Sequence, residues 1–308
     1  MAEGLLKNIL RTFCVQALGF AVNLACGILI ARHLGPTGRG DWAAITSVIS
    51  IIATFSYFAA GYAIVYLRSS TDLTRHELFR AAIVISLVGT LICLTAALIG
   101  SAWLSQGSRA AFTHCLLLYG AGQLFANAGT FVSMIFLADR QFGRANLAGL
   151  LPRLLVLIGY GGLLLFRRFT VLDVVLVNIG ASGLLLGWLL FWFRDAFSER
   201  SSLWPVALGR MLRYGIKVWL GLLAQAVTMR ADQVIMAALL PRAVLGLYAV
   251  SVTVAELAGF FAGAAGFIIG PTAANLQGAE LARAIGRSFR VTGLIVVGTA
   301  LVMYAAGP

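Results

Sequence analysis

Long apolar runs separated by short polar gaps dominate the sequence. A helix needs about 20 apolar residues to cross the hydrocarbon core of a bilayer. The runs are continuous rather than alternating, which predicts membrane-spanning helices and excludes a membrane β-barrel. Nine spans are expected, near residues 9–33, 41–67, 78–102, 112–138, 147–166, 171–194, 212–239, 243–274 and 286–306.

Composition supports this interpretation. The 308-residue chain is 60% hydrophobic and 11% charged, with a mean hydropathy of +0.94, whereas soluble domains have roughly 45–50% apolar and about 25% charged residues. We therefore expect an all-α polytopic membrane protein. The first apolar run follows Lys7 and Arg11 as in a signal peptide, but another span follows directly, so it is predicted to be a transmembrane helix.

The net charge of +12 first suggests a nucleic-acid partner. The basic residues, however, lie in short gaps between spans, where the positive-inside rule places them, and no soluble basic domain exists to bind nucleic acid. Most of the 23 Lys and Arg residues fall in the gaps on the same side as the N-terminus, which is therefore expected in the cytoplasm. The gaps on the outward side hold only Arg32, Arg39, Arg109, Arg167, Arg168 and Arg242.

Cysteines and histidines give no sign of a metal site or a disulfide framework. The cysteines lie in or at the ends of apolar runs, and the histidines are scattered. No metal or cofactor is expected at these residues, which are Cys14, Cys26, Cys93, Cys115, His33, His76 and His114.

The polar break "ARHLGPTGRGDWA" (31–43) separates the first two spans. Its glycines resemble a phosphate-binding loop, but such a loop needs G-x-x-x-x-G-K-[ST] after a strand, and neither is present here. The charge distribution also places it outside the cytoplasm. It is predicted to be a tight helix–helix turn, in which Pro36 and the glycines end one span and start the next.

A weak internal repeat aligns residues 28–43 with residues 234–249. Gly40 meets Gly246 and Trp42 meets Tyr248 in that alignment. Six spans separate the two stretches, so both halves have the same orientation, and transporters often place their substrate site between such repeats.

The repeat predicts an N-terminal lobe of six spans at residues 1–200 and a partial C-terminal lobe of three spans at residues 201–308. The longest hydrophilic connection, 195–210, lies at that boundary. Because a complete second lobe would need about three more spans by this repeat, we expect a chain truncated at its C-terminus.

The stretch "ARHLGPTGRGDWAAITSVISIIATFSYFAAGYAIVYL" resembles the start of oligosaccharide flippases of the polysaccharide transporter family, in the multidrug/oligosaccharidyl-lipid/polysaccharide exporter superfamily. "RADQVIMAALLPRAVLGLYAVSVTVAELAGFF" is similar to the second-lobe signature of that family, an Asp in the seventh helix followed by a turn and G-x-Y. The family has twelve to fourteen helices, more than the nine expected here.

This resemblance implies a multi-pass protein of the bacterial inner membrane. It implies transport of undecaprenyl-pyrophosphate-linked oligosaccharides from the cytoplasmic to the periplasmic leaflet, for O-antigen of lipopolysaccharide, capsule or exopolysaccharide. The implied mechanism is alternating access between two lobes around a polar cavity, with H⁺ or Na⁺ coupling. Polymerases and glycosyltransferases of the same pathway are the implied partners.

Polar side chains within spans are costly and are therefore candidates for function. The seventh span is the richest in them. One helical face is predicted to carry Lys217, Gln225, Thr228 and Asp232.

Arg230 lies on a different face of this span, and two interpretations stay open. In the first, Arg230 and Lys217 bind a pyrophosphate and Asp232 couples transport to a cation. In the second, Arg230 pairs with an acid such as Glu256, and Lys217 anchors the cytoplasmic end of the helix. Glu256 is either that partner or a protonatable coupling group.

The first lobe offers fewer charges. Its amides either form hydrogen bonds between helices or bind sugar hydroxyls. The substrate-cavity candidates in this lobe are Arg11, which aligns with Lys217, together with Asn23, Gln123, Asn127 and Asn178.

Three other functions are alternatives. A cation-coupled multidrug antiporter of the same superfamily is expected to need acids in its cavity, and this sequence offers more bases. A membrane glycosyltransferase or polymerase would need a large outward loop with catalytic acids, and the outward gaps are short, so no enzyme activity is expected. The third alternative is a non-functional fragment.

Overall fold

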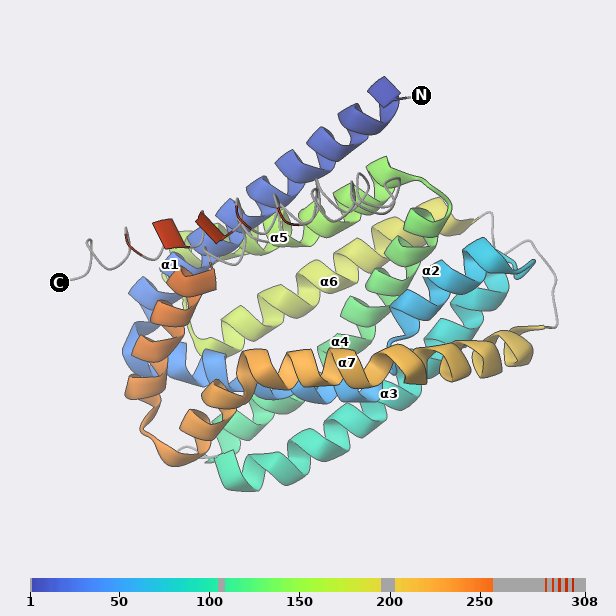
Figure 1. Ribbon diagram of the computed structural model, residues 1–308. Helices are drawn as coiled ribbons and strands as arrows, with labels where there is room; N and C mark the ends of the chain where they lie inside the picture. Colours follow the sequence, from blue (N-terminus) through green and yellow to red (C-terminus); the bar gives the residue numbers. More distant parts are fainter. Residues whose placement is uncertain are drawn as a thin grey trace. The chain divides into compact units, whose positions relative to one another are not determined.

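The computed structural model describes residues 2–104, 109–194 and 203–256, with side chains from residue 14, and isolated positions between 286 and 301. This part of the chain is helical throughout, apart from short turns (Figure 1). The helices are α1 (Ala2–Ser56), α2 (Ala60–Ser70), α3 (Arg75–Leu104), α4 (Arg109–Ala138), α5 (Phe142–Leu165), α6 (Val171–Phe193) and α7 (Trp204–Leu239). Residues 242–256 are also helical.

The chain divides into two compact units. One contains residues 25–249, and the other contains residues 1–24 and 250–308. All contacts described below lie within the 25–249 unit. The two lobes expected at residues 1–200 and 201–308 are defined by the sequence repeat and not by compactness, so they stay a prediction.

Among the described residues, five helical segments are long and apolar enough to cross a membrane. They are Cys14–Ser70, Arg75–Ala102, Ala110–Ala138, Phe142–Leu165 and Val171–Phe193. These segments confirm the prediction of an all-α polytopic membrane protein. Helix α7, with 36 residues, does not qualify on composition, because it carries several charged and polar side chains. Most of the last two expected spans, 243–274 and 286–306, lies outside the described residues.

The break at residues 31–43 is a kink inside α1. Gly35 is its single non-helical residue (φ 67°, ψ −178°), and Pro36 follows directly. A positive φ is readily adopted only by glycine, and proline cannot donate a hydrogen bond to the preceding turn, so the two residues together redirect the helix. The predicted turn is confirmed in a shorter form.

The expected span 41–67 lies within the apolar segment Cys14–Ser70, but its helix is interrupted. Helix α1 ends at Ser56, and Phe58 (φ 46°) and Ala59 (φ 54°) adopt left-handed conformations before α2 begins. Such a break frees backbone carbonyls, which must find other partners within a membrane. The indole of Trp219 in α7 supplies one by donating to the Phe55 carbonyl (3.0 Å).

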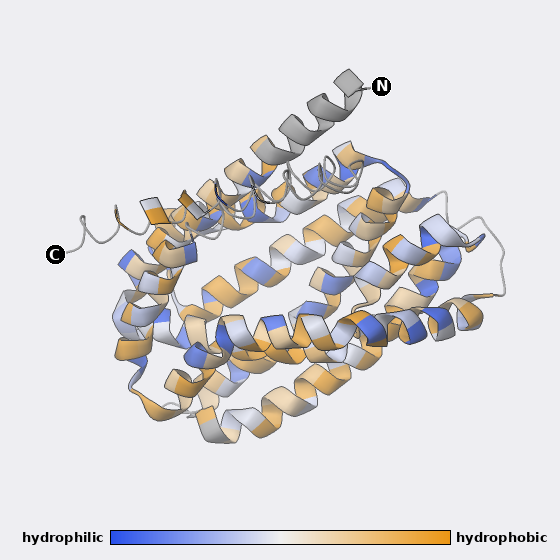
Figure 2. Ribbon diagram, in the orientation of Figure 1, coloured by the Kyte–Doolittle hydropathy of each residue, from blue (hydrophilic) through white to orange (hydrophobic). Residues whose placement is uncertain are grey.

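The core of the 25–249 unit lies where α2, α3, α4 and α6 meet, with α7 packed on α2 and α3. Figure 2 shows that apolar residues cover most of these helices and that polar residues are dispersed along α7. Many large apolar side chains point outward, among them Ile99 and Leu165, at 70% and 84% exposure. Outward-facing apolar side chains are expected where lipid replaces water as the solvent.

Candidate functional site

The candidate site begins at the junction of two turns that align in the sequence repeat. We call residues 36–41 and 242–246 the turn junction. Arg242 is 6% exposed, and its Nε lies 3.1 Å from Oδ1 of Asp41. Burial lowers the pKa of the Arg242 guanidinium, and the Asp41 carboxylate opposes that shift. The ion pair therefore compensates a charge that would otherwise be costly to bury.

Arg242 also holds the ends of two other helices. Its guanidinium donates to the carbonyl of Ala237 (2.7 Å) in the last turn of α7 and to the carbonyl of Leu104, the last residue of α3. It also lies over the ring of Phe112 in α4, 4.7 Å from the centroid. Arginine suits this position because its planar fork donates in several directions at once.

Two glycines allow the turns of the junction to touch. A Cβ atom at Gly40 would collide with the carbonyl oxygen of Arg242, and one at Gly246 would collide with the carbonyl oxygen of Pro36. Gly40 and Gly246 are the residues that the repeat aligns, so each repeat places its glycine against the backbone of the other. The reciprocal contact gives the weak sequence repeat a structural counterpart.

Along α1 and α7, a second group of polar side chains lies close to the turn junction and joins the two helices. Ser47 donates to Oε1 of Gln233 (2.6 Å), and both side chains are buried. The neighbouring carboxylate of Asp232 accepts from the backbone N–H of Gln233 (2.8 Å) and from the hydroxyl of Tyr248. We call Ser47, Asp232, Gln233 and Tyr248 the α1–α7 seam. It connects α1, α7 and the helix 242–256.

The other end of α7 packs on α1 and α2 through aromatic rings. Trp219 stacks on Phe58 with ring centroids 5.6 Å apart, and Tyr214 stacks on Tyr66 at 4.2 Å. A Cβ at Gly215 would collide with the Phe58 carbonyl. Helix α7 therefore contacts α1 and α2 around residues 214–219 and α1 again at Gln233.

The residues of the predicted polar face of α7 make different contacts. Lys217, Gln225 and Thr228 are exposed, and Thr228 donates to the Ala224 carbonyl (2.8 Å) of its own helix. Asp232 instead belongs to the seam. At about 3.6 residues per turn the four positions lie within about 80° of one another around α7 and so share one face. Asp232 lies where that face meets the helix 242–256.

Arg230 and Glu256 stay candidates. Arg230 is half-buried in α7, while Glu256 is exposed and belongs to the other compact unit. Their pairing remains a prediction.

The first-lobe candidates are scattered. Asn23 is exposed, and the side chain of Arg11 lies outside the described residues. Asn127 donates to the Gln123 carbonyl (2.8 Å) within α4. Asn178 of α6 donates to the hydroxyl of the buried Tyr160 in α5 (2.8 Å). This last bond has the geometry expected for packing between helices.

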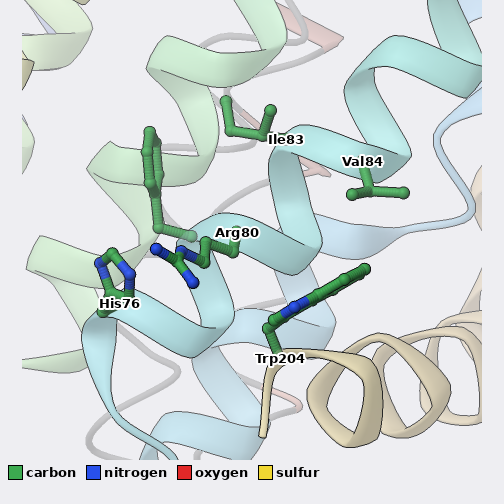
Figure 3. Close-up of a pocket in the computed structure, with 6 residues that line it drawn as sticks. His76, Arg80, Ile83, Val84 and Trp204 are labelled. Carbon is green, nitrogen blue, oxygen red and sulfur yellow. The ribbon is translucent and has the colours of Figure 1, made fainter. Parts of the chain in front are cut away.

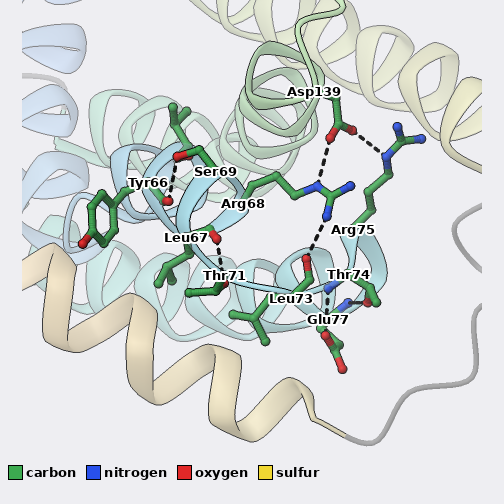
Figure 4. A network of polar contacts seen from close by, with 11 residues as sticks. Tyr66, Leu67, Arg68, Ser69, Thr71, Leu73, Thr74, Arg75, Glu77 and Asp139 are labelled. Atoms are coloured by element: carbon green, nitrogen blue, oxygen red, sulfur yellow. Dashed lines mark hydrogen bonds and ion pairs between the residues drawn. The ribbon is translucent and has the colours of Figure 1, made fainter.

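Several contributors to these clusters were not among the site candidates from the sequence, namely Asp41, Arg242, Ser47, Gln233, Tyr248 and Asp139. Ser47 and Gln233 were hidden in apolar runs, although Gln233 directly follows the candidate Asp232. Asp139 was also missed, and its carboxylate binds both Arg68 (2.9 Å) and Arg75 (Figure 4). A lone acid between the arginine-rich ends of two spans was the available signal for Asp139.

The Asp139 cluster fixes the connection between α2 and α3. Arg68 also donates to the Leu73 carbonyl (2.9 Å). Thr74 and Glu77 exchange hydrogen bonds at the start of α3, which is a capping box (Figure 4). Within the described part of the chain, no group of His, Cys, Asp and Glu is arranged to hold a metal ion.

Comparison with solved structures shows which fold these helices form. The MATE multidrug transporter DinF-BH has a TM-score of 0.72 at 14% identity, over 98% of this chain and 75% of that one. An outward-facing multidrug resistance transporter of the MATE family and MOP superfamily has a TM-score of 0.55 at 16% identity, over 95% and 77% of the two chains. A MOP superfamily transporter from Pyrococcus furiosus gives 0.53 at 14% identity, over 97% and 70%.

Comparison by sequence identifies the family. No curated protein matches the chain significantly. The model of a family described as polysaccharide biosynthesis protein matches residues 29–308, which include the turn junction, the α1–α7 seam and the Asp139 cluster. The chain therefore belongs to the polysaccharide biosynthesis protein family and has the membrane fold of MOP superfamily transporters.

Proposed function

We propose that this protein transports polyprenyl-pyrophosphate-linked oligosaccharides across the bacterial inner membrane, with its N-terminus in the cytoplasm. The glycans would enter O-antigen, capsule or exopolysaccharide, and the protein would act without covalent chemistry of its own. Family membership, the transporter fold and the five apolar segments support the proposal. Polymerases and glycosyltransferases of the same pathway are the proposed partners.

One observation favours an anionic substrate over a cationic drug. Asp41, the acid of the turn junction, is already engaged by Arg242, so it offers no free carboxylate to a cationic drug. Lys217, in contrast, is exposed on α7. A pyrophosphate group would meet basic rather than acidic side chains, and charge-assisted bonds to phosphate oxygens are the stronger kind.

The turn junction supports an alternating-access mechanism. Its two turns belong to opposite lobes if the lobes divide near residue 200 as the repeat predicts. The ion pair and the reciprocal glycine contacts would then hold the lobes together on the outward side. Opening to that side requires Asp41 and Arg242 to separate, so their attraction sets part of the free-energy difference between the two states.

Asp232 is the proposed coupling residue for H⁺ or Na⁺. Tyr248 donates to its carboxylate, and the adjacent Gln233 binds Ser47 across the seam. A proton or cation on Asp232 would weaken the charge-assisted bond from Tyr248. Asp232 lies where α1, α7 and the helix 242–256 meet. A change of charge on Asp232 would therefore alter the packing of these helices and, with it, the contact between the two turns of the junction.

The test uses the full chain in proteoliposomes that contain a fluorescent polyprenyl-pyrophosphate oligosaccharide. Movement between leaflets is measured by the accessibility of the fluorophore to a membrane-impermeant reductant. We expect protein-dependent movement, a loss of about tenfold in the double variant Lys217→Gln/Arg230→Gln, and little change in Arg210→Gln, which removes an exposed arginine from the same helix.

The structural similarity to MATE multidrug transporters makes a cation-coupled drug antiporter the second candidate. Export of cationic dyes without any movement of the oligosaccharide lipid would favour it. If neither substrate moves, and the chain also fails to complement a flippase-deficient strain, the proposal of an active transporter is wrong.

A further inference from the structure

A pocket lies between the start of α3 and the start of α7, separate from the turn junction and the α1–α7 seam. Its volume is about 390 Å³. That volume lies within the range of about 300–1,000 Å³ that is usual for small-molecule sites. The lining residues are His76, Phe79, Arg80, Ile83 and Val84 of α3 and Trp204 of α7 (Figure 3).

The surface of the pocket is almost entirely apolar, and two basic residues are among those that line it. Phe79, Ile83, Val84 and the indole of Trp204 form the apolar walls. Arg80 is exposed at the surface, whereas His76 is only 2% exposed, and no acid is among the lining residues. Figure 3 shows Arg80 and Trp204 on either side of the space. A ligand that suits both parts of this lining has an anionic group joined to an apolar chain.

The position of the pocket in the fold points to the bilayer as the source of that ligand. Arg75–Ala102 is one of the five apolar segments, and the pocket lies within its first ten residues. Lipid headgroups lie at the ends of membrane-spanning helices, where tryptophan and arginine are the typical side chains. Basic pockets between helices on the cytoplasmic side bind anionic headgroups.

We propose that this pocket binds one anionic phospholipid. The exposed Arg80 binds the phosphate, and an acyl chain packs along Phe79, Ile83 and Trp204. The lipid bridges α3 to α7 at the residue where α7 begins. It therefore stabilises the attachment of α7 to the first helices, whatever substrate the protein carries.

Native mass spectrometry of the full chain tests the proposal. The protein is released from nanodiscs that contain equal amounts of phosphatidylglycerol and phosphatidylcholine. We expect one phosphatidylglycerol to be retained preferentially. Arg80→Gln should reduce that retention about fivefold. Arg210→Gln is the matched control, because it removes an exposed arginine of α7 that does not line the pocket.

A second variant separates the pocket from surface charge. Val84→Phe keeps both basic side chains but fills the apolar part of the space. We expect it to lose phosphatidylglycerol as Arg80→Gln does, while helical circular dichroism and elution volume stay unchanged. Equal losses in Arg80→Gln and Arg210→Gln, or full retention in Val84→Phe, would show that the lipid is held by general surface charge and would overturn the proposal.

Discussion

Asp41 and Arg242 form an ion pair between two turns that occupy aligned positions in the two halves of the sequence. The N–O distance is 3.1 Å, and Arg242 is buried against Phe112 and the end of α7. The pair lies beside Gly40 and Gly246, whose backbones touch the opposite turn. An ion pair and a close backbone contact therefore lie at the same place, and single substitutions at the junction can test each of them separately.

Arg242→Leu should destabilise the protein by about 3 kcal/mol, because the loss of one partner of a buried ion pair leaves the other charge unpaired, at a typical cost of about 3–5 kcal/mol. The expected cost lies at the lower end of this range because the Asp41 side chain is 27% exposed and water partly solvates its charge. Thermal unfolding in detergent measures the effect. Arg213→Leu removes an exposed arginine of α7 and serves as the control. Equal stability of the two variants would contradict the structural importance of the pair.

Gly40→Ala and Gly246→Ala should each destabilise the protein by more than about 2 kcal/mol, because overpacking typically costs about 1–3 kcal/mol and here the obstacle is a backbone carbonyl that cannot change rotamer. Gly209→Ala is the matched control, since its Cβ would meet open space in α7. In that helix alanine should be neutral or stabilising by about 0.5–1 kcal/mol. If all three variants unfold at the same temperature, the close contact of Gly40 and Gly246 with the opposite backbone is refuted.

Cross-linking Asp41→Cys to Arg242→Cys with a short reagent should stop transport, because the proposed mechanism requires these turns to separate. Cleavage of a reducible linker should restore transport in the same sample. The assay is the movement of the oligosaccharide lipid in proteoliposomes, and each single cysteine variant treated with the reagent is a control. Undiminished transport by the cross-linked protein would exclude the turn junction as a gate.

Tyr248→Phe should slow transport several-fold while leaving stability almost unchanged, because the hydroxyl holds the proposed coupling residue Asp232. Asp232→Asn should abolish the response to an imposed ion gradient. Tyr62→Phe removes a hydroxyl from an exposed tyrosine and is the control. If Tyr248→Phe and Tyr62→Phe transport at the same rate with and without the gradient, the seam has no part in coupling.

Asp139→Asn should destabilise the connection between α2 and α3 by about 2 kcal/mol, because it leaves Arg68 and Arg75 facing each other without a counter-charge, and lost hydrogen bonds to a charged group cost about 1.5–3 kcal/mol. Asp72→Asn changes an exposed acid of the same connection. Limited proteolysis between residues 70 and 75 compares the two. Faster cleavage in Asp72→Asn than in Asp139→Asn would contradict the prediction.

Several features follow from the sequence because they depend on local composition. Continuous apolar runs predict helices of membrane-spanning length, since every buried backbone group must be satisfied within its own helix. Gly35 and Pro36 predict the first break, because their backbone preferences do not depend on neighbours. The alignment of Gly40 with Gly246 indicated a repeat, and the motifs around them indicated the family.

The tertiary structure decided which residues meet. Arg242 counted as one more loop arginine in the sequence, yet it is buried with Asp41, which lies far away along the chain. Ser47 and Gln233 form a bond that no local pattern could indicate. The break at Phe58 and Ala59 lies in an apolar run, where Trp219 of α7 satisfies a carbonyl. Local composition determines whether a segment enters the membrane, but partners from distant helices determine where a helix breaks and which buried charges are tolerated.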